Sequence, residues 1–309
     1  MKVVFMGTPD FAAETLKAIL LAGHEVAAVV TQPDKPKGRG KELAMSPVKE
    51  FAVTKGLRVL QPAKARDEEF VEQIKEIAPQ VIVVVAFGQI LPEVILDLPK
   101  YGCINVHASL LPKYRGASPI QWAVIDGEKE SGVTTMLMDK GVDTGDMLLQ
   151  KKMTLAPKET GGSLFDRLSI LGAELLVETL KGLEEGTIER TPQNHDEATH
   201  TKKIEKSLGK LDFSRPAKEL ECLIRGLNPW PSAYTQFHGK ILKIWDADVV
   251  CGDFEEYEPG QVVSVEKNCF IVKCGEDALA IKELQLEGKK RMNTSAFLLG
   301  FKVEAGESL

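Results

Sequence analysis

Asn105, His107 and Asp143 are the residues whose types and spacing fit chemistry on a carbonyl group. Asn105 and His107 are two positions apart, so on an extended segment both side chains point to one side while Val106 points into the core. Asp143 follows His107 by 36 positions, within a Val-Asp-Thr-Gly run. An amide, an imidazole and a carboxylate together can hold a carbonyl, stabilise an oxyanion and move a proton. These are the needs of acyl transfer to an amine.

An open, mostly parallel sheet is expected to position Asn105 and His107. The first half of the chain alternates apolar β-rich runs with helical stretches, which is typical of an α/β fold with right-handed crossovers. The expected strands are Lys2–Met6, Glu25–Thr31, Arg58–Val59, Val81–Val85 and Cys103–Val106, and the expected helices are Phe11–Ala22, Ser46–Lys55, Glu68–Ile77 and Ile120–Ile125. Ligands of such sheets bind beyond the carboxyl ends of the strands. The Asn-Val-His run closes the fifth strand.

Asp143 is expected in a turn of the same sheet. A strand over Val133–Met138 and its hairpin partner over Met147–Met153 flank it, and a long amphipathic helix follows over Gly162–Lys181. The polar stretch Gly186–Ser207 is typical of a linker that runs over the surface. It puts a domain boundary between residues 206 and 207.

Residues 207–309 are expected to form a small closed β-barrel. A helix over Pro216–Leu227 ends at an Asn-Pro-Trp-Pro run, whose prolines stop it. Short strands separated by turn residues follow at Ala233–Phe237, Lys240–Val249, Gly260–Val265, Cys269–Cys274 and Ala278–Leu286. At 309 residues the chain is long enough for two domains, each with its own core.

Composition limits the possible partners. The net charge of −6 argues against a surface coated with basic groups for non-specific nucleic-acid binding, so any RNA contact must be local. The five cysteines are odd in number and lack a Cys-x-x-Cys pair, which indicates neither disulfides nor a tetrahedral metal site. We also find no carboxylate cluster suited to Mg²⁺. The opening strand is not a leader and no apolar run reaches the roughly 20 residues of a membrane span, so we expect a cytoplasmic protein.

The longer run around the Asn-x-His pair is more specific than the pair itself. Alone, such a pair at a strand end is more often a turn or capping element. Here residues 105–116 read Asn-Val-His-Ala-Ser-Leu-Leu-Pro-Lys-Tyr-Arg-Gly, with Asp-Thr-Gly-Asp at 143–146. The chain resembles the folate-dependent formyltransferases, most closely the branch that acts on methionyl-tRNA. The resemblance extends from Val3 to about Leu286.

This resemblance implies a Rossmann-like formyltransferase fold over residues 1–206, with the linker at its end, and an OB-like tRNA-binding barrel over 207–309. It implies transfer of the formyl group of 10-formyltetrahydrofolate to the α-amino group of initiator methionyl-tRNA, for translation initiation. Our hypothesis is that Asn105 and protonated His107 donate hydrogen bonds to the formyl oxygen. Asp143 would pair with His107, favour its charged form and help move the proton of the amine. No covalent intermediate is needed, because an amine is itself a nucleophile.

The folate site is assigned to three segments by the same resemblance. The first segment, residues 87–91, resembles a pterin pocket, although alone it would be interpreted as a strand end entering a helix. The second segment, residues 109–112, follows His107. The third segment, residues 138–142, precedes Asp143. The expected folate contacts are Phe87, Gln89, Ile90, Leu91, Ser109, Leu110, Leu111, Pro112 and Asp139. Ser109 fits a loop hydrogen bonder as well as a ligand contact.

The tRNA site is assigned to two groups of cations. The first lies in residues 32–49, a basic stretch rich in Pro and Gly that we expect to be an irregular loop; the second follows the last expected strand. The expected tRNA contacts are Lys37, Arg39, Lys41, Lys289, Lys290 and Arg291. Charge runs are usually solvated surface. Residues 207–309 moreover hold 13 Lys and Arg against 16 Asp and Glu, so the barrel is not basic overall.

Four alternatives remain beside this interpretation. A formyltransferase acting on a purine-pathway ribonucleotide or on a nucleotide-linked amino sugar would use the same three site residues but would lack the basic loop. A dinucleotide-dependent oxidoreductase would need Gly-x-Gly-x-x-Gly, whereas the first turn reads Gly-Thr-Pro-Asp-Phe at residues 7–11. A non-enzymatic RNA-binding protein would leave the Asn-x-His pair and Asp143 without a role. The chain is expected to be a monomer that holds no metal and contacts no membrane.

Overall fold

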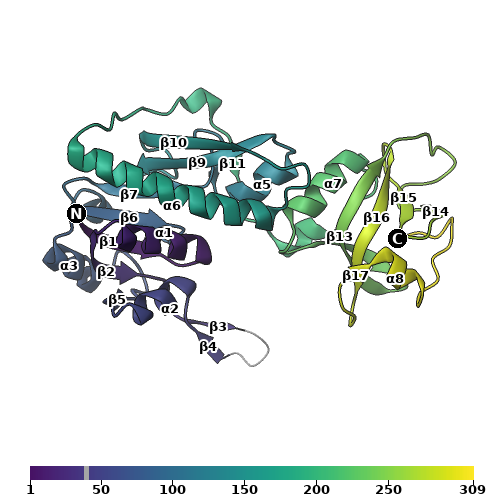
Figure 1. Ribbon diagram of the computed structural model, residues 1–309, viewed down its shortest axis with the longest axis horizontal. Helices are drawn as coiled ribbons and strands as arrows, with labels where there is room; N and C mark the ends of the chain where they lie inside the picture. The colour runs from purple at the N-terminus through teal and green to yellow at the C-terminus, as the bar shows by residue number, and fades with distance from the viewer. Residues whose placement is uncertain (38–41) are drawn as a thin grey trace. The chain divides into compact units, whose positions relative to one another are not determined.

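The computed structural model describes residues 1–37 and 42–309, and the chain forms two compact units (Figure 1). Unit 1 comprises Met1–Gly116, Glu130–Met153 and Phe165–His200. Unit 2 comprises Ala117–Lys129, Thr154–Leu164 and Thr201–Leu309. Three stretches that precede the expected boundary therefore belong to unit 2, namely residues 117–129, 154–164 and 201–206. The assignment of catalysis to residues 1–206 and of RNA binding to 207–309 stays a prediction.

Unit 1 is built on a seven-stranded sheet in the order β10-β9-β7-β6-β1-β2-β5. The strands are β1 Lys2–Gly7, β2 Glu25–Val30, β5 Val59–Leu60, β6 Val81–Val85, β7 Cys103–His107, β9 Glu130–Leu137 and β10 Met147–Thr154. The pairs from β5 to β7 are parallel, and β9 runs antiparallel to β7. All five residues of β6 are buried, as a central strand with both faces covered requires. The predicted α/β fold is confirmed.

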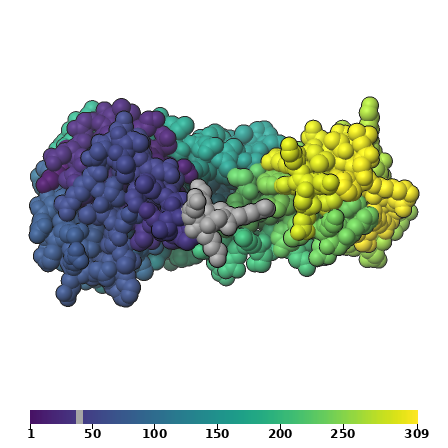
Figure 2. All heavy atoms as spheres, turned by 90° about the horizontal axis from the view of Figure 1, so that it is seen from below, coloured from purple at the N-terminus to yellow at the C-terminus, as the bar shows by residue number. Residues whose placement is uncertain are grey.

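Helices cover both faces of this sheet. They are α1 Asp10–Leu21, α2 Pro47–Thr54, α3 Glu68–Ile77, α4 Glu93–Leu96 and α6 Gly161–Glu185. On one face α3 and α4 pack on β1, β2 and β6 in a single apolar cluster. On the other, Gly172 of α6 lies so close to Val106 and Phe11 that an added Cβ would touch both. In Figure 2 the N-terminal part of this unit, purple to blue, packs as a continuous body.

The basic stretch is not wholly irregular, which corrects our expectation. β3 Lys35–Lys37 pairs antiparallel with β4 Glu42–Ala44. The prolines in this stretch suggested a loop. In a ribbon of only two strands, however, each strand has one edge without a partner, and Pro36 lacks only an N–H that would point to that edge, so no hydrogen bond between the strands is lost. Arg39 and Lys41 lie outside the described residues. The entry to the hairpin is held by Asp34, whose carboxylate accepts from Lys49 Nζ at 2.6 Å.

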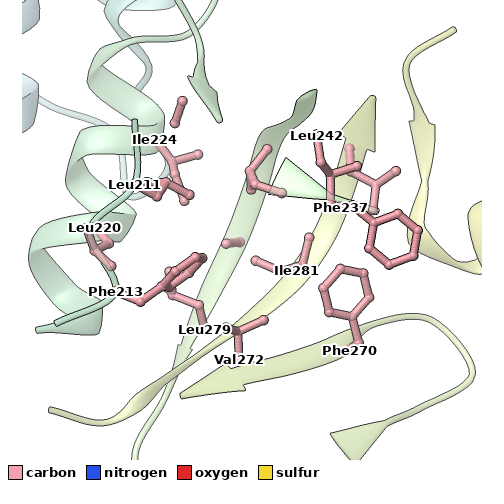
Figure 3. Packing of buried hydrophobic residues seen from close by; sticks show 14 of the residues in the cluster. Leu211, Phe213, Leu220, Ile224, Phe237, Leu242, Phe270, Val272, Leu279 and Ile281 are labelled. Carbon is pink, nitrogen blue, oxygen red and sulfur yellow. The ribbon is translucent and has the colours of Figure 1, made fainter. Parts of the chain in front are cut away.

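Unit 2 combines the helices α5, α7 and α8 with an antiparallel sheet in the order β12-β13-β16-β15-β14, with β17 on β16. The elements are α5 Pro119–Ile125, α7 Ala217–Gly226, β12 Ala233–Phe237, β13 Lys240–Val250, β14 Val262–Val265, β15 Phe270–Lys273, β16 Ala278–Leu286, β17 Met292–Asn293 and α8 Thr294–Leu298. Figure 3 shows Leu220 and Ile224 of α7 in one apolar core with Phe270 and Ile281 of the sheet. The sheet is consistent with the expected small barrel-like domain.

Short elements complete the chain. β8 Arg115–Gly116 pairs with β11 His200–Thr201, and the 3-10 turns η1 His195–Glu197 and η2 Lys206–Gly209 flank the second of these strands. Among the described residues, no helix is both long and apolar enough to cross a membrane. Over residues 1–37 and 42–309, no group of three or more His, Cys, Asp or Glu side chains is arranged to hold a metal ion.

Candidate active site

Asn105 and His107 reach the same carboxylate, that of Asp143, from the end of β7. Asn105 Nδ2 stands 3.4 Å from Asp143 Oδ1, and His107 Nδ1 stands 3.6 Å from Asp143 Oδ2. The predicted same-side orientation is correct, with Val106 buried on the opposite face. The side chains of His107 and Asp143 are only 8% and 13% exposed, so the three groups form a compact, nearly buried site. We call these three residues the Asp143 site.

The second nitrogen of His107 is fixed by the backbone. His107 Nε2 stands 2.9 Å from the carbonyl oxygen of Tyr114. A carbonyl only accepts, so Nε2 carries a proton and donates it to Tyr114. Nδ1 therefore faces Asp143, at a distance beyond that of an ordinary hydrogen bond. The sequence did not indicate this contact, and it means that His107 can reach a formyl oxygen only if one nitrogen changes partner.

The Asp143 loop, residues 139–145, holds Asp143 in a left-handed conformation with φ 55°. Its carboxylate accepts from the Gly116 N–H at 2.8 Å. Gly145 has no room for a side chain, because an added Cβ would lie 1.8 Å from the carbonyl oxygen of Leu137. Asp139 stabilises the loop from within, accepting from Gly141 N at 3.0 Å and from the hydroxyl of Thr144. Asp139 was predicted as a folate contact, and its carboxylate is already engaged inside the loop.

A buried pair behind the loop was not predicted. Gln193 Nε2 donates to the carbonyl oxygens of Asp143, at 2.9 Å, and Gly145, at 2.7 Å. Gln193 Oε1 accepts from Arg115 Nε and NH2 at 3.0 and 2.8 Å. Both residues are buried, Gln193 at 5% and Arg115 at 3% exposure. Gln193 lies in the polar stretch that we interpreted as a surface linker, and only its partners 48 and 50 positions earlier reveal its role.

The first predicted folate segment is brought beside the Asp143 loop. Phe87 and Leu91 are buried in one apolar cluster, against which Met138 packs. Gln89 is also engaged, since its Oε1 accepts from Ala65 N at 2.6 Å. Ile90, by contrast, is 82% exposed and offers an apolar side chain to a ligand.

The second predicted folate segment follows His107. The Ser109 hydroxyl donates to the Lys113 carbonyl at 2.7 Å, and both Ser109 and Leu111 are buried. Leu110 and Pro112 are half-buried, and the Leu111-Pro112 peptide bond is cis. Ser109 is thus a loop hydrogen bonder, as one of its two expected roles required.

The predicted tRNA contacts of unit 2 are exposed and differ in their surroundings. Arg291 is ion-paired with Glu283 and stacks over the Trp245 ring with its guanidinium carbon 4.6 Å from the ring centroid. Lys289 and Lys290 are exposed at the adjoining turn. Of the other predicted cations, Lys37 lies in β3, but its side chain is not among the described atoms. Arg39 and Lys41 are not among the described residues.

Comparisons with known proteins agree with this fold and this site. Residues 1–180 match the family described as formyl transferase, and residues 203–302 match the formyl transferase C-terminal domain. The chain belongs to the formyl transferase family and is an enzyme of that class. Its full-length relatives include the methionyl-tRNA formyltransferases of Lachnospira eligens, 64% identical over 100% of this chain and 99% of the relative, and of Agathobacter rectalis, 60% identical over 99% and 98%.

Two solved structures share the fold at low identity. An N-formyltransferase from Helicobacter canadensis, in complex with folinic acid and dTDP-3-aminofucose, has a TM-score of 0.67 and 20% identity over 91% of this chain and 99% of its own. HypX from Aquifex aeolicus, in complex with tetrahydrofolic acid, has a TM-score of 0.63 and 17% identity over 97% of this chain and 47% of its own. The expected formyltransferase fold is confirmed, and the oxidoreductase and the non-enzymatic RNA-binding protein are set aside.

Proposed function

We propose that this chain transfers the formyl group of 10-formyltetrahydrofolate to the α-amino group of methionine on initiator methionyl-tRNA. The observation that carries the proposal is the approach of Asn105 and His107 to Asp143 at the carboxyl end of β7. Full-length relatives at 64% and 60% identity, named for methionyl-tRNA, support the acceptor. The folate ligands of the Aquifex aeolicus and Helicobacter canadensis structures, which share this fold, support the donor. We place the reaction in the cytoplasm, where initiator tRNA is used.

Formyl transfer is one addition followed by one elimination. The nitrogen of the free amine attacks the formyl carbon, the carbonyl oxygen becomes an oxyanion, and the amine nitrogen loses a proton. The bond from the formyl carbon to N10 of the folate then breaks, and N10 takes up a proton. The protein must therefore supply oxyanion donors and a group that accepts and returns a proton.

Asn105 is the first oxyanion donor in this scheme. Its amide carries two N–H groups, and Asp143 at 3.4 Å engages one of them only weakly. The other is available to a formyl oxygen. A preorganised donor of this kind typically lowers the barrier by on the order of 3 kcal/mol.

His107 and Asp143 move the proton. The Tyr114 carbonyl fixes the imidazole ring through Nε2, so proton exchange takes place at Nδ1, which faces Asp143. Once Asp143 has taken the proton of the amine, it no longer attracts a protonated Nδ1, and the Nδ1–H of the fixed ring can donate to the oxyanion instead. Because the Nδ1 contact of 3.6 Å is long, changing partner costs little.

The folate is proposed to lie along the three segments named from the resemblance. The buried side chains of Phe87, Leu91, Ser109 and Leu111 would shape that surface, while Ile90 would contact the pterin ring directly. Lys289, Lys290 and Arg291, together with Lys37, Arg39 and Lys41 of the basic stretch at residues 32–49, are proposed to contact the tRNA. A monomeric state stays part of the prediction.

The acceptor is tested by offering the protein 10-formyltetrahydrofolate with methionyl initiator tRNA, glycinamide ribonucleotide or a dTDP-linked amino sugar. We expect formylmethionyl-tRNA to form rapidly and neither small amine to be formylated. His107→Ala serves as the matched inactive control. Formylation of a small amine at a higher kcat/KM than the tRNA would overturn the proposal.

A further inference from the structure

Gln193 stands out from its surroundings in the chain. Residues 183–203 are all described, and Gln193 is the one buried residue among them. Its side chain turns inward from an exposed segment and is 5% exposed. Burying an amide costs free energy unless its hydrogen bonds are satisfied. Its partners should therefore reveal why it is buried.

All the hydrogen-bonding capacity of the Gln193 amide is used. Its two N–H groups donate to the carbonyl oxygens of Asp143 and Gly145, at 2.9 and 2.7 Å. Its oxygen accepts from two nitrogens of Arg115, at 3.0 and 2.8 Å. An amide has two donors and two lone pairs, so each has one partner. The contacts fix the backbone on both sides of Thr144.

Arg115 connects this amide to the opposite side of the same carboxylate. The residue after it, Gly116, donates its N–H to Asp143 Oδ2 at 2.8 Å. Its third guanidinium nitrogen, NH1, stands 3.2 Å from His195 Nδ1, which accepts because a guanidinium only donates. The segment Arg115–Gly116 thus contacts the Asp143 carboxylate directly through Gly116, and it supports the Asp143 backbone indirectly through Arg115 and Gln193.

Asp143 needs such support because of its backbone conformation. At φ 55° it occupies the left-handed region, which an aspartate adopts less readily than a glycine. Any relaxation of that angle would swing the carboxylate away from Asn105 and His107. We propose that Gln193, oriented by Arg115, is a positioning residue that sets the Asp143 carboxylate against His107. This inference rests on the proposed function for its kinetic consequences, but Gln193 itself touches no reacting atom.

Gln193→Glu is the sharpest test, because it preserves shape. The carboxylate keeps its contact with Arg115, but it faces the carbonyls of Asp143 and Gly145 with an oxygen in place of the two N–H donors. We expect kcat to fall by about 10- to 100-fold, as for a misplaced catalytic group, with both KM values within about twofold of native. The pH profile of kcat should also change, because the carboxylate that moves the proton no longer stands in its native position against His107. Arg115→Lys, which keeps the charge without the fork, should show a smaller change in the same direction.

Thr15→Val is the matched control within unit 1. Thr15 is fully buried in α1, and its hydroxyl donates to the Phe11 carbonyl at 3.3 Å. The substitution removes a buried hydrogen bond far from the Asp143 site in the sequence, and kcat and its pH profile should stay native. Equal losses of kcat in both variants, or a native kcat and pH profile in Gln193→Glu, would overturn the inference.

A second readout does not depend on activity. Imidazole NMR of His107 in the ligand-free protein, recorded at one fixed pH, should give ring chemical shifts in Gln193→Glu that differ from native, while Thr15→Val leaves them unchanged. Unchanged His107 chemical shifts in Gln193→Glu would contradict the positioning role even if no acceptor is formylated. A native protein that formylates nothing, with changed His107 chemical shifts in the variant, would instead remove the proposed function and leave the positioning role standing.

Discussion

Asp143 in unit 1 and Glu221 in unit 2 are both nearly buried carboxylates, yet their partners stand at different distances. Glu221 accepts from Arg225 Nε at 2.7 Å and NH2 at 2.9 Å, with Lys158 Nζ at 3.3 Å. Asp143 has a short contact with the Gly116 N–H at 2.8 Å, but its two side-chain partners stand at 3.4 and 3.6 Å. A carboxylate with short contacts to cations stabilises a fold. One with long contacts leaves its neighbours able to change partner during a reaction.

Electrostatics supports the structural role of Glu221. Burial acts to raise the pKa of its carboxyl, but the hydrogen bond and charge of Arg225, with the charge of Lys158, outweigh burial and lower the pKa below its ordinary value of 4.5. Lys158 also pairs with Asp248 at 2.7 Å, so it ties the segment before α6 to β13 within unit 2. The two carboxylates should therefore respond differently to substitution.

The largest expected effect is on the rate, from His107→Ala. This variant removes an oxyanion donor and the proton-exchange partner of Asp143, so kcat should fall by about 1,000-fold. The thermal midpoint should change by only a few degrees, because the distance from His107 to Asp143 is too long for a strong ion pair. Steady-state formylation and thermal unfolding of the same preparation measure both. If the His107→Ala variant unfolded at the assay temperature, the Asp143 site would also stabilise the fold, and the contrast with Glu221 would be contradicted.

The next effect is on stability, from Arg225→Met. This change leaves the buried Glu221 carboxylate without its main partner, and the free energy of unfolding should fall by about 3 kcal/mol. Urea unfolding measures the decrease, and kcat below the transition should stay native. The double variant Arg225→Met with Glu221→Gln is the control, because it removes the uncompensated charge and should recover part of the stability. A large loss of kcat in the folded Arg225→Met variant would show that Glu221 and its cationic partners do more than stabilise the fold.

A smaller effect is expected on the stability of the protein at acidic pH. Because the pKa of Glu221 is lowered in the folded state, its ionisation contributes stability that is present above pH 4.5 and is lost as the pH falls through the lower folded value. Glu221→Gln lacks this contribution, so its thermal midpoint should fall less steeply below pH 4.5 than that of the native protein. Scanning calorimetry at pH values on either side of 4.5 compares the two. Parallel curves would show that Glu221 is not held by its cations as described.

The smallest effect is expected at the exposed lysines of unit 2. Lys289→Ala with Lys290→Ala should raise KM for methionyl-tRNA by only a fewfold and leave kcat native. The slope of the salt dependence of binding should fall by about one unit for each phosphate that the variant no longer neutralises. Lys302→Ala with Lys267→Ala, which removes two exposed lysines of unit 2 that are not predicted tRNA contacts, is the charge-matched control. Equal changes in both variants would indicate a general effect of charge rather than a contact with RNA.

Local patterns in the sequence predicted much of unit 1. The apolar run of β6 and the alternation along β7 are set by neighbours in the chain, so the sheet and the shared orientation of Asn105 and His107 could be inferred. The position of Asp143 in a turn between two strands followed in the same way.

What the sequence did not predict depends on contacts between distant segments. Nothing in the exposed stretch 183–203 marks Gln193 as buried, because its partners lie near residues 115 and 143. The carbonyl of Tyr114 fixes His107 through a backbone atom, which has no residue signature. The inclusion of residues 117–129 and 154–164 in unit 2 likewise depends on packing, which periodicity does not report.

The most direct test of this account is single-turnover formylation of methionyl initiator tRNA by Asp143→Asn, with both substrates saturating. Asparagine keeps the size of the side chain and an oxygen that accepts from Gly116, but it cannot take up the proton of the amine. We predict a rate at least about 100-fold below native with unchanged binding of the tRNA. A rate near native would contradict the central claim that formyl transfer takes place at the Asp143 site.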